Sequence, residues 1–182
     1  MSNIFRSSIS FKIGTWLIQK RLQKRQRVVQ TKNLGQAKII AIVVNLVEDD
    51  AKSTLQSQLN LLKKQGIKKV DVLAFKRNWK TEDKAEIQNW IQISPDDFDW
   101  LYLPQKNLKN VVLKDYDILI NLATKQNKFV FNLLTLSKAK FKVGLATSTF
   151  ADLLDFTINV DPAEKDKFLK SLHHYLTILN KN

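Results

Sequence analysis

The sequence contains no cysteine, only four glycines and three prolines, and no long apolar run. Without cysteine there are no disulfides, no thiol chemistry and no cysteine-ligated zinc. No segment approaches the roughly 20 apolar residues that a membrane-spanning helix needs. Basic residues and serines interrupt the apolar residues near the N-terminus, so this segment is not a signal peptide. We expect a cytoplasmic protein, peripheral on the inner membrane face if it binds lipid.

The scarcity of glycine also argues against the usual phosphate-binding loops. None of the four glycines belongs to a GxGxxG or Walker motif. Acidic residues follow the first predicted strand, where a phosphate-binding turn needs glycines and free backbone amides. The only histidines, His173 and His174, are adjacent on a predicted helix and point about 100° apart, so they do not converge on one metal. We therefore expect no cofactor, no metal and no identifiable catalytic residue, and favour a protein that is not an enzyme.

Acidic residues are missing from residues 1–37, which carry eight of the thirty basic residues. The net charge of the whole chain is +13, so its basic character is concentrated at this end. The high lysine content elsewhere is typical of a biased base composition, whereas four of the five arginines lie in this segment. We predict that five residues of the segment bind an anionic partner: Lys20, Arg21, Lys24, Arg25 and Arg27.

The basic cluster follows an apolar segment, and together they predict a helix over about residues 10–31. Ile9, Ile13, Trp16 and Leu17 share one broad face of this helix, while a second apolar face lies opposite. The residues predicted to enter a membrane or contact a partner are Phe11, Trp16 and Leu17. The helix and its continuation (residues 1–34) are predicted to precede one domain (residues 35–182).

Strands and helices alternate through residues 35–182. Apolar, β-branched runs predict strands at 38–46, 69–75, 116–122, 141–146 and 156–160, with a weaker one at 88–93. Helices are expected at 51–65 and 127–140, and a last one begins with a capping box at Asp161. This alternation predicts an α/β, Rossmann-like three-layer sandwich with five or six mostly parallel strands.

Two resemblances agree with this fold. The basic start, the strand at 39–45, Asp99-Trp-Leu and the stretch from Tyr116 to Gly144 resemble an uncharacterised bacterial domain-of-unknown-function family over nearly the whole chain. That family implies a fold and no activity. Residues 116–144 are also similar to part of the N-terminal Rossmann-like domain of heptosyltransferase-type glycosyltransferases. Those enzymes bind the nucleotide-sugar with a second domain, for which this chain has no room.

Polar residues follow the predicted strands where open α/β sheets bind ligands. Those singled out for a small polar ligand are Asn45, Asp49, Asn121 and Thr124. The competing interpretation is structural, with Asp49 or Asp50 capping the next helix. Similarly, Asp96, Asp97 and Asp99 beside Trp100 are interpreted as a solvated loop whose tryptophan covers the sheet edge, rather than as a sugar site.

The basic helix is the strongest functional feature. It is interpreted as contacting an anionic membrane surface, contacting RNA or a ribosome, or docking on its own domain or a protein partner. We predict a non-enzymatic adaptor that presents this helix to an anionic partner, with the membrane surface ahead of RNA. The alternative from another class is a single-domain glycosyl- or nucleotide-handling enzyme that uses the strand ends.

Overall fold

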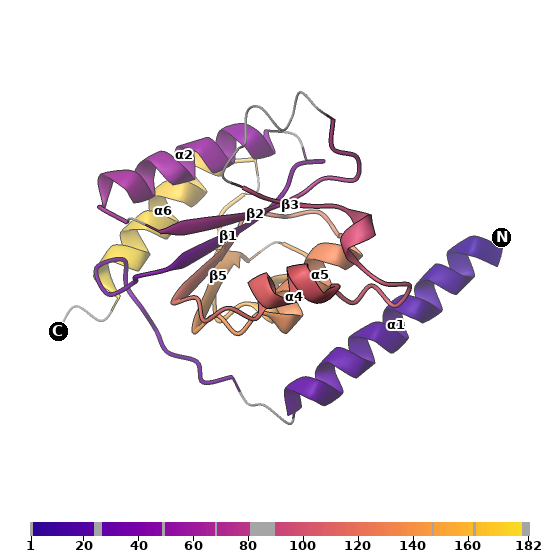
Figure 1. Cartoon of the computed structure of the whole chain (residues 1–182). Coiled ribbons are helices and arrows are strands. Elements are labelled where there is room, and N and C mark those ends of the chain that lie inside the picture. Colours follow the sequence, from indigo (N-terminus) through magenta and orange to yellow (C-terminus); the bar gives the residue numbers. More distant parts are fainter. Residues whose placement is uncertain are drawn as a thin grey trace.

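A computed structural model describes residues 2–23, 27–48, 50–67, 69–80, 90–146, 148–161 and 163–179; for residues 2–8 and 21–23 it gives the backbone alone. The described strands form one six-stranded, all-parallel sheet in the order β3-β2-β1-β4-β5-β6 (Figure 1). Their bounds are β1 Ile40–Asn45, β2 Val70–Phe75, β3 Ile91–Ile93, β4 Ile118–Asn121, β5 Phe141–Leu145 and β6 Phe156–Ile158. The strand order reverses between β1 and β4, as in Rossmann-like folds.

The central strands are buried on both faces because helices cover both. Every residue of β1, β4 and β5 is buried. On one face lie α2 (Ala51–Lys64) and α6 (Lys165–Ile178), and on the other lie α4 (Lys106–Val112) and α5 (Lys128–Leu136) (Figure 1). Two short 3₁₀ turns, η1 (Pro95–Asp97) and η2 (Ala151–Leu153), complete the described elements. The predicted three-layer α/β sandwich is confirmed.

The N-terminal helix α1 (Ser2–Gln23) lies outside these three layers and packs against α5 (Figure 1). The predicted bounds, 10–31, were wrong at both ends. Helical structure begins near the N-terminus, and residues 27–30 are not helical. Residues 27–30 instead form hydrogen bonds with another part of the chain, and such tertiary bonds override a helical preference.

Residues 27–37, which we name the strap, run past the amino-terminal ends of the strands. The backbone N–H of Gln30 donates to Lys140 O at 3.0 Å, and that of Leu34 donates to Leu176 O at 2.8 Å. Leu34 is buried in the core, and the Asn33 side chain donates to Leu179 O. The strap is therefore a fixed part of the domain, although the sequence placed most of it in a separate N-terminal segment.

The last helix also starts later than its sequence signature predicts. Helix α6 begins at Lys165, and its N-cap residue is Glu164, which forms no side-chain capping bond. Asp161 instead accepts a hydrogen bond from the backbone N–H of Ala163, closing a local turn. The predicted capping box at Asp161 is wrong because the same side chain satisfies a turn equally well.

The sequence was least informative between β2 and β4. The strand predicted at 88–93 is present as β3, but helix α4 was not predicted. Only two α4 residues, Leu108 and Val112, are buried, so its apolar stripe is too short to show a helical period.

Candidate functional site

Helix α1 uses one of its two apolar faces to dock on the domain. The Phe11 ring lies edge-on to Phe131 and Tyr102, with centroids 5.6 and 5.8 Å away. Ile18 is fully buried, and Gly14 lies so close to the carbonyl of Leu101 that no Cβ would fit there. Phe11 therefore belongs to the docked face of α1, as the alternative of docking on its own domain predicts.

The opposite face of α1 presents apolar side chains to solvent. Ile9, Ile13 and Trp16 are 47%, 42% and 54% exposed. Their spacing of four and three residues places them in one stripe along the helix. Lys20 continues the stripe, with Nζ 4.9 Å from the centre of a Trp16 ring, and Lys12 beside it is exposed. We name these five residues the outer face of α1. Leu17 is half-buried at its border.

The basic cluster is only partly described. Lys20 is exposed on α1, and the backbone of Arg21 belongs to the same helix. Lys24 and Arg25 lie outside the described residues. Arg27 is engaged by its own domain: its guanidinium forms an ion pair with Asp155 and donates to Ala139 O at 2.7 Å. Of the predicted anion-binding residues, Arg27 therefore has its charge compensated within the chain.

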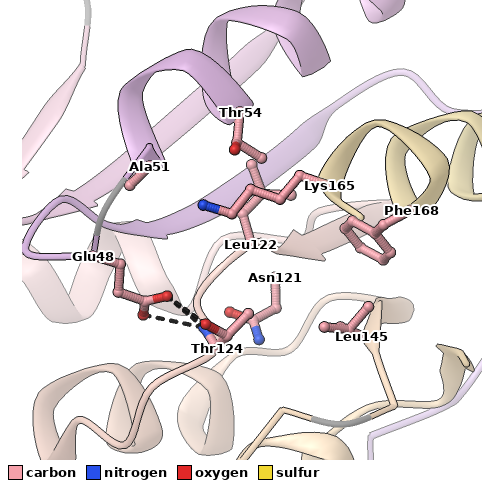
Figure 2. Close-up of a pocket in the computed structure, with 9 residues that line it drawn as sticks. All are labelled: Glu48, Ala51, Thr54, Asn121, Leu122, Thr124, Leu145, Lys165 and Phe168. Carbon is pink, nitrogen blue, oxygen red and sulfur yellow. Dashed lines mark hydrogen bonds between the residues drawn. The ribbon is translucent and has the colours of Figure 1, made fainter. Parts of the chain in front are cut away.

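At the carboxyl ends of the strands, Asn45 and Thr124 are held by Glu48, and Asn121 is held by the backbone of Ala123. The Glu48 carboxylate accepts hydrogen bonds from the Thr124 hydroxyl at 2.6 Å, from two backbone N–H groups and from the Asn45 amide (Figure 2). Asn121 is buried and bonds to both the N–H and the carbonyl of Ala123. Glu48, which the sequence reasoning did not single out, thus ties the loop after β1 to the loop after β4.

The space beside these residues is divided into two unequal parts. Asn121 and Thr124 line a cavity of about 30 Å³, which has room for little more than a water molecule (Figure 2). Asn45 lines a larger crevice of about 710 Å³ on the other side, between the ends of β1 and β2 and the start of α5. Asp49 lies outside the described residues. Among the described residues, the structure therefore does not bring Asn45 together with Asn121 and Thr124 around one ligand-sized space.

Two of the polar residues that line the larger crevice, Asn127 and Lys128, have structural partners. Asn127 accepts from the backbone N–H groups of Phe129 and Val130 and so caps α5. The ammonium of Lys128 lies over the rings of Phe11 and Tyr102. The capping bonds occupy amides that an anion would otherwise use. This crevice has the volume for a ligand, but its buried polar side chain, Asn45, already bonds to Glu48 and to the backbone N–H of Val47.

The helix cap predicted after β1 is also different in the structure. Asp50 is the N-cap residue of α2, but it adopts a left-handed conformation (φ 56°) and makes no side-chain capping bond. Its carboxylate lies 3.5 Å from Lys165 Nζ instead. The predicted side-chain cap at Asp50 is therefore wrong.

Glu48→Ala should destabilise the domain by about 2–4 kcal/mol. The substitution removes a partly buried carboxylate that accepts several hydrogen bonds, and bonds to charged groups contribute about 1.5–3 kcal/mol each while their effects overlap. Urea unfolding followed by circular dichroism measures this loss. Glu164→Ala is the matched control, because Glu164 forms only an exposed pair with Lys167 and should cost less than about 0.5 kcal/mol. Equal losses in both variants would contradict a tethering role for Glu48.

In the acidic loop before α4, the carboxylates of Asp97 and Asp99 accept hydrogen bonds from residues of the same loop. Asp97 accepts from the backbone and hydroxyl of Ser94, and Asp99 accepts from the backbone N–H groups of Leu101 and Leu103. Trp100 is 73% exposed, so the expectation that it covers the sheet edge is wrong. It adds an exposed aromatic to the loop that contacts α1.

The comparison with protein families gives one match over most of the chain. A family of unknown function (DUF6913) matches residues 11–179. The chain belongs to this family. The part matched to DUF6913 begins at Phe11, which docks α1, and ends at Leu179, whose carbonyl accepts from the strap residue Asn33. It therefore includes the docked part of α1 and the strap along with the sheet.

Two further findings concern this DUF6913 chain. A search of the curated proteins found no match. Within the described residues, no helix combines the length and the apolar character needed to span a membrane.

Proposed function

We propose that this protein is a peripheral adaptor that binds anionic membrane surfaces through the outer face of α1. The observation that carries the proposal is the exposed stripe of Ile9, Ile13 and Trp16 on a helix whose other face is already docked. A docked helix normally exposes polar residues, so a second apolar face exposed to water indicates a partner. The surrounding segment, residues 1–37, has eight basic residues and no acidic residue, which favours a negatively charged partner.

The chemistry of the stripe favours lipid over RNA. Isoleucine side chains gain free energy by leaving water for the acyl region, whereas an RNA backbone offers them no apolar environment. Tryptophan prefers the boundary between headgroups and acyl chains. Lys12 and Lys20 flank the stripe, where their ammonium groups would reach lipid phosphates. An interfacial helix of this kind lies flat on the surface.

The geometry of docking also makes the face rigid. Phe11, Gly14 and Ile18 hold α1 against the domain, so the stripe is presented without the entropic cost of forming the helix at the membrane. The domain itself would then be carried to the surface as a unit, which is the role of an adaptor.

The double variant Ile13→Ser with Trp16→Ser should bind phosphatidylglycerol-containing vesicles at least about thirtyfold more weakly than the unmodified protein. Each substitution removes apolar area worth about 1–2 kcal/mol on insertion. Co-sedimentation with vesicles, at several salt concentrations, measures the partition. Binding by the unmodified protein should fall as salt rises, because the charged part of the attraction is screened.

The control for this experiment is Ile178→Ser. Ile178 is 46% exposed on α6, which covers the opposite face of the sheet from α5. The Ile178→Ser variant should bind vesicles as tightly as the unmodified protein does. Equal weakening by Ile178→Ser, or no binding to anionic vesicles by the unmodified protein, would overturn the proposal. Retention on RNA that is unaffected by the double variant would point to nucleic acid instead.

A further inference from the structure

A cavity of about 440 Å³ lies where the strap passes the start of β5. It is within the range of volumes that small ligands occupy. Four basic side chains line it, together with two hydroxyl groups and one carboxylate. The charged residues are Arg27, Lys138, Lys140, Lys142 and Asp115, and the hydroxyls belong to Thr135 and Ser137. It is lined by more basic side chains than either cavity at the carboxyl edge.

Two of the four cations are compensated by carboxylates of this chain. Arg27 pairs with Asp155, and Lys140 donates to Asp117 at 2.8 Å. The two pairs fix the strap and the loop before β5, so they form the rigid wall of the cavity. Lys138 and Lys142 are the other two cations, and Asp115 is the single carboxylate among the residues that line the cavity.

Lys142 is the most unusual of these residues. Its side chain is 4% exposed, yet among the described residues no carboxylate forms an ion pair with it. Its Nζ donates to Leu134 O at 2.6 Å, near the end of α5. An ammonium group has three donors, and this bond uses one. A buried ammonium without a counter-ion is costly, so it either loses its proton or takes its counter-charge from a bound ion or ligand.

We propose that this cavity binds a phosphoryl group, with Lys142 Nζ as its buried contact and Lys138 at its rim. A phosphoryl group carries up to two negative charges and several acceptor oxygens, which match the free donors of Lys142 and the hydroxyl of Ser137. The Thr135 hydroxyl already donates to Phe131 O at 2.8 Å. The group comes from a lipid headgroup or from a soluble phosphorylated compound. In the lipid case, the inference rests on the proposed function, since the cavity adjoins the strap that follows α1.

The first experiment uses sulfate, which resembles the phosphoryl dianion and keeps its charge over the working pH range. The full chain is titrated with sulfate at pH 6, where Lys142 is protonated, and binding is followed by NMR shifts of the backbone amides at 135–142. We expect Lys142→Met to weaken sulfate binding at least tenfold and Lys138→Gln to weaken it about threefold. Lys170→Gln, an exposed residue on α6, is the control and should leave binding unchanged.

The outcomes are distinct. Loss of binding in Lys142→Met, with an unchanged circular dichroism spectrum, supports the site. Equal sulfate affinity in Lys142→Met and the unmodified protein overturns it, and so does the absence of shifts at 135–142. Because this experiment contains no vesicles, it can fail while the vesicle binding of α1 succeeds, and the reverse is equally possible.

The second experiment identifies the source of the phosphoryl group. Vesicles containing phosphatidylinositol 4-phosphate are compared with phosphatidylglycerol vesicles of equal total charge. Tighter binding to the former, abolished by Lys142→Met, assigns the site to a lipid headgroup. Equal binding to both vesicles, together with sulfate binding that needs Lys142, assigns it to a soluble compound.

Discussion

Lys142→Met should make the protein more stable at neutral pH, by about 3 kcal/mol. Burial, reinforced by the nearby Arg27 guanidinium, lowers the pKa of Lys142 to about 7, and Asp155 offsets this only in part. The folded protein therefore binds the Lys142 proton far less strongly than the unfolded chain does, and each tenfold difference costs about 1.4 kcal/mol. Methionine has a similar shape and no charge. Its gain is reduced by about 1–2 kcal/mol because Leu134 O loses a donor.

The pH dependence of this gain is a sharper test than its size. Between about pH 7 and the ordinary lysine pKa of 10.5, the unfolded state holds the Lys142 proton more strongly than the folded state. The stability of the unmodified protein should therefore rise with pH in this window, relative to Lys142→Met. The electrostatic part of the difference is largest at pH 7 and below and disappears as pH approaches 10.5, where the lost hydrogen bond leaves Lys142→Met about 1–2 kcal/mol less stable than the unmodified protein. Other groups titrate in both proteins and cancel in the difference.

Urea unfolding at pH 6, 7, 8.5 and 9.5, in a buffer free of sulfate and phosphate, measures this difference. Lys170→Met is the control, because Lys170 is exposed and its replacement should change stability little at any pH. A Lys142→Met protein that is less stable than the unmodified one at pH 7 would show that the ammonium is well compensated. A constant difference from pH 6 to 9.5 would show that the pKa of Lys142 is ordinary.

The sheet could be predicted from the sequence because its strands are buried on both faces. The runs at 40–44 and 118–120 are apolar without interruption, which marks central parallel strands whatever surrounds them. Helix ends were predicted less well because they depend on tertiary contacts. Residues 27–30 were predicted to continue the helix, but Arg27 and Gln30 form hydrogen bonds to the chain just before β5 instead.

For the candidate sites too, features set by neighbouring residues could be predicted, whereas contacts between residues far apart in the sequence could not. The two apolar faces of α1 were visible in the sequence, and the structure places Ile9, Ile13 and Trp16 on one and Phe11 and Ile18 on the other. The sequence could not show which face is docked, because the partner residues lie more than 80 positions away. Likewise, little in the local sequence distinguishes the buried Lys142 from its half-buried neighbours Lys138 and Lys140. Its one signal is a charge in the middle of an otherwise apolar strand.

The docking of α1 can be tested at its closest approach, with Gly14→Ala. A Cβ at position 14 would lie 1.9 Å from the carbonyl oxygen of Leu101, and a backbone atom cannot move aside as a flexible side chain does. In an isolated helix, alanine in place of glycine stabilises by about 1 kcal/mol. In the docked helix, the clash should exceed this gain, so α1 should separate from α5 and the loop at 99–102. The direction of the effect thus distinguishes docking from mere helix formation.

Hydrogen exchange of the α1 amides, read by mass spectrometry on peptides from residues 9–23, measures the separation. Gly14→Ala should accelerate exchange at least tenfold, which corresponds to a loss of about 1.4 kcal/mol or more. Gly35→Ala is the matched control, because its nearest neighbour outside the adjacent residues is Asn33 Oδ1 at 3.4 Å, and exchange in α1 should not change. Slower exchange in Gly14→Ala would mean that α1 does not rest on Leu101. In that case Phe11 and Ile18 would be available to a membrane as well, and the outer face would no longer be the helix's single exposed apolar surface.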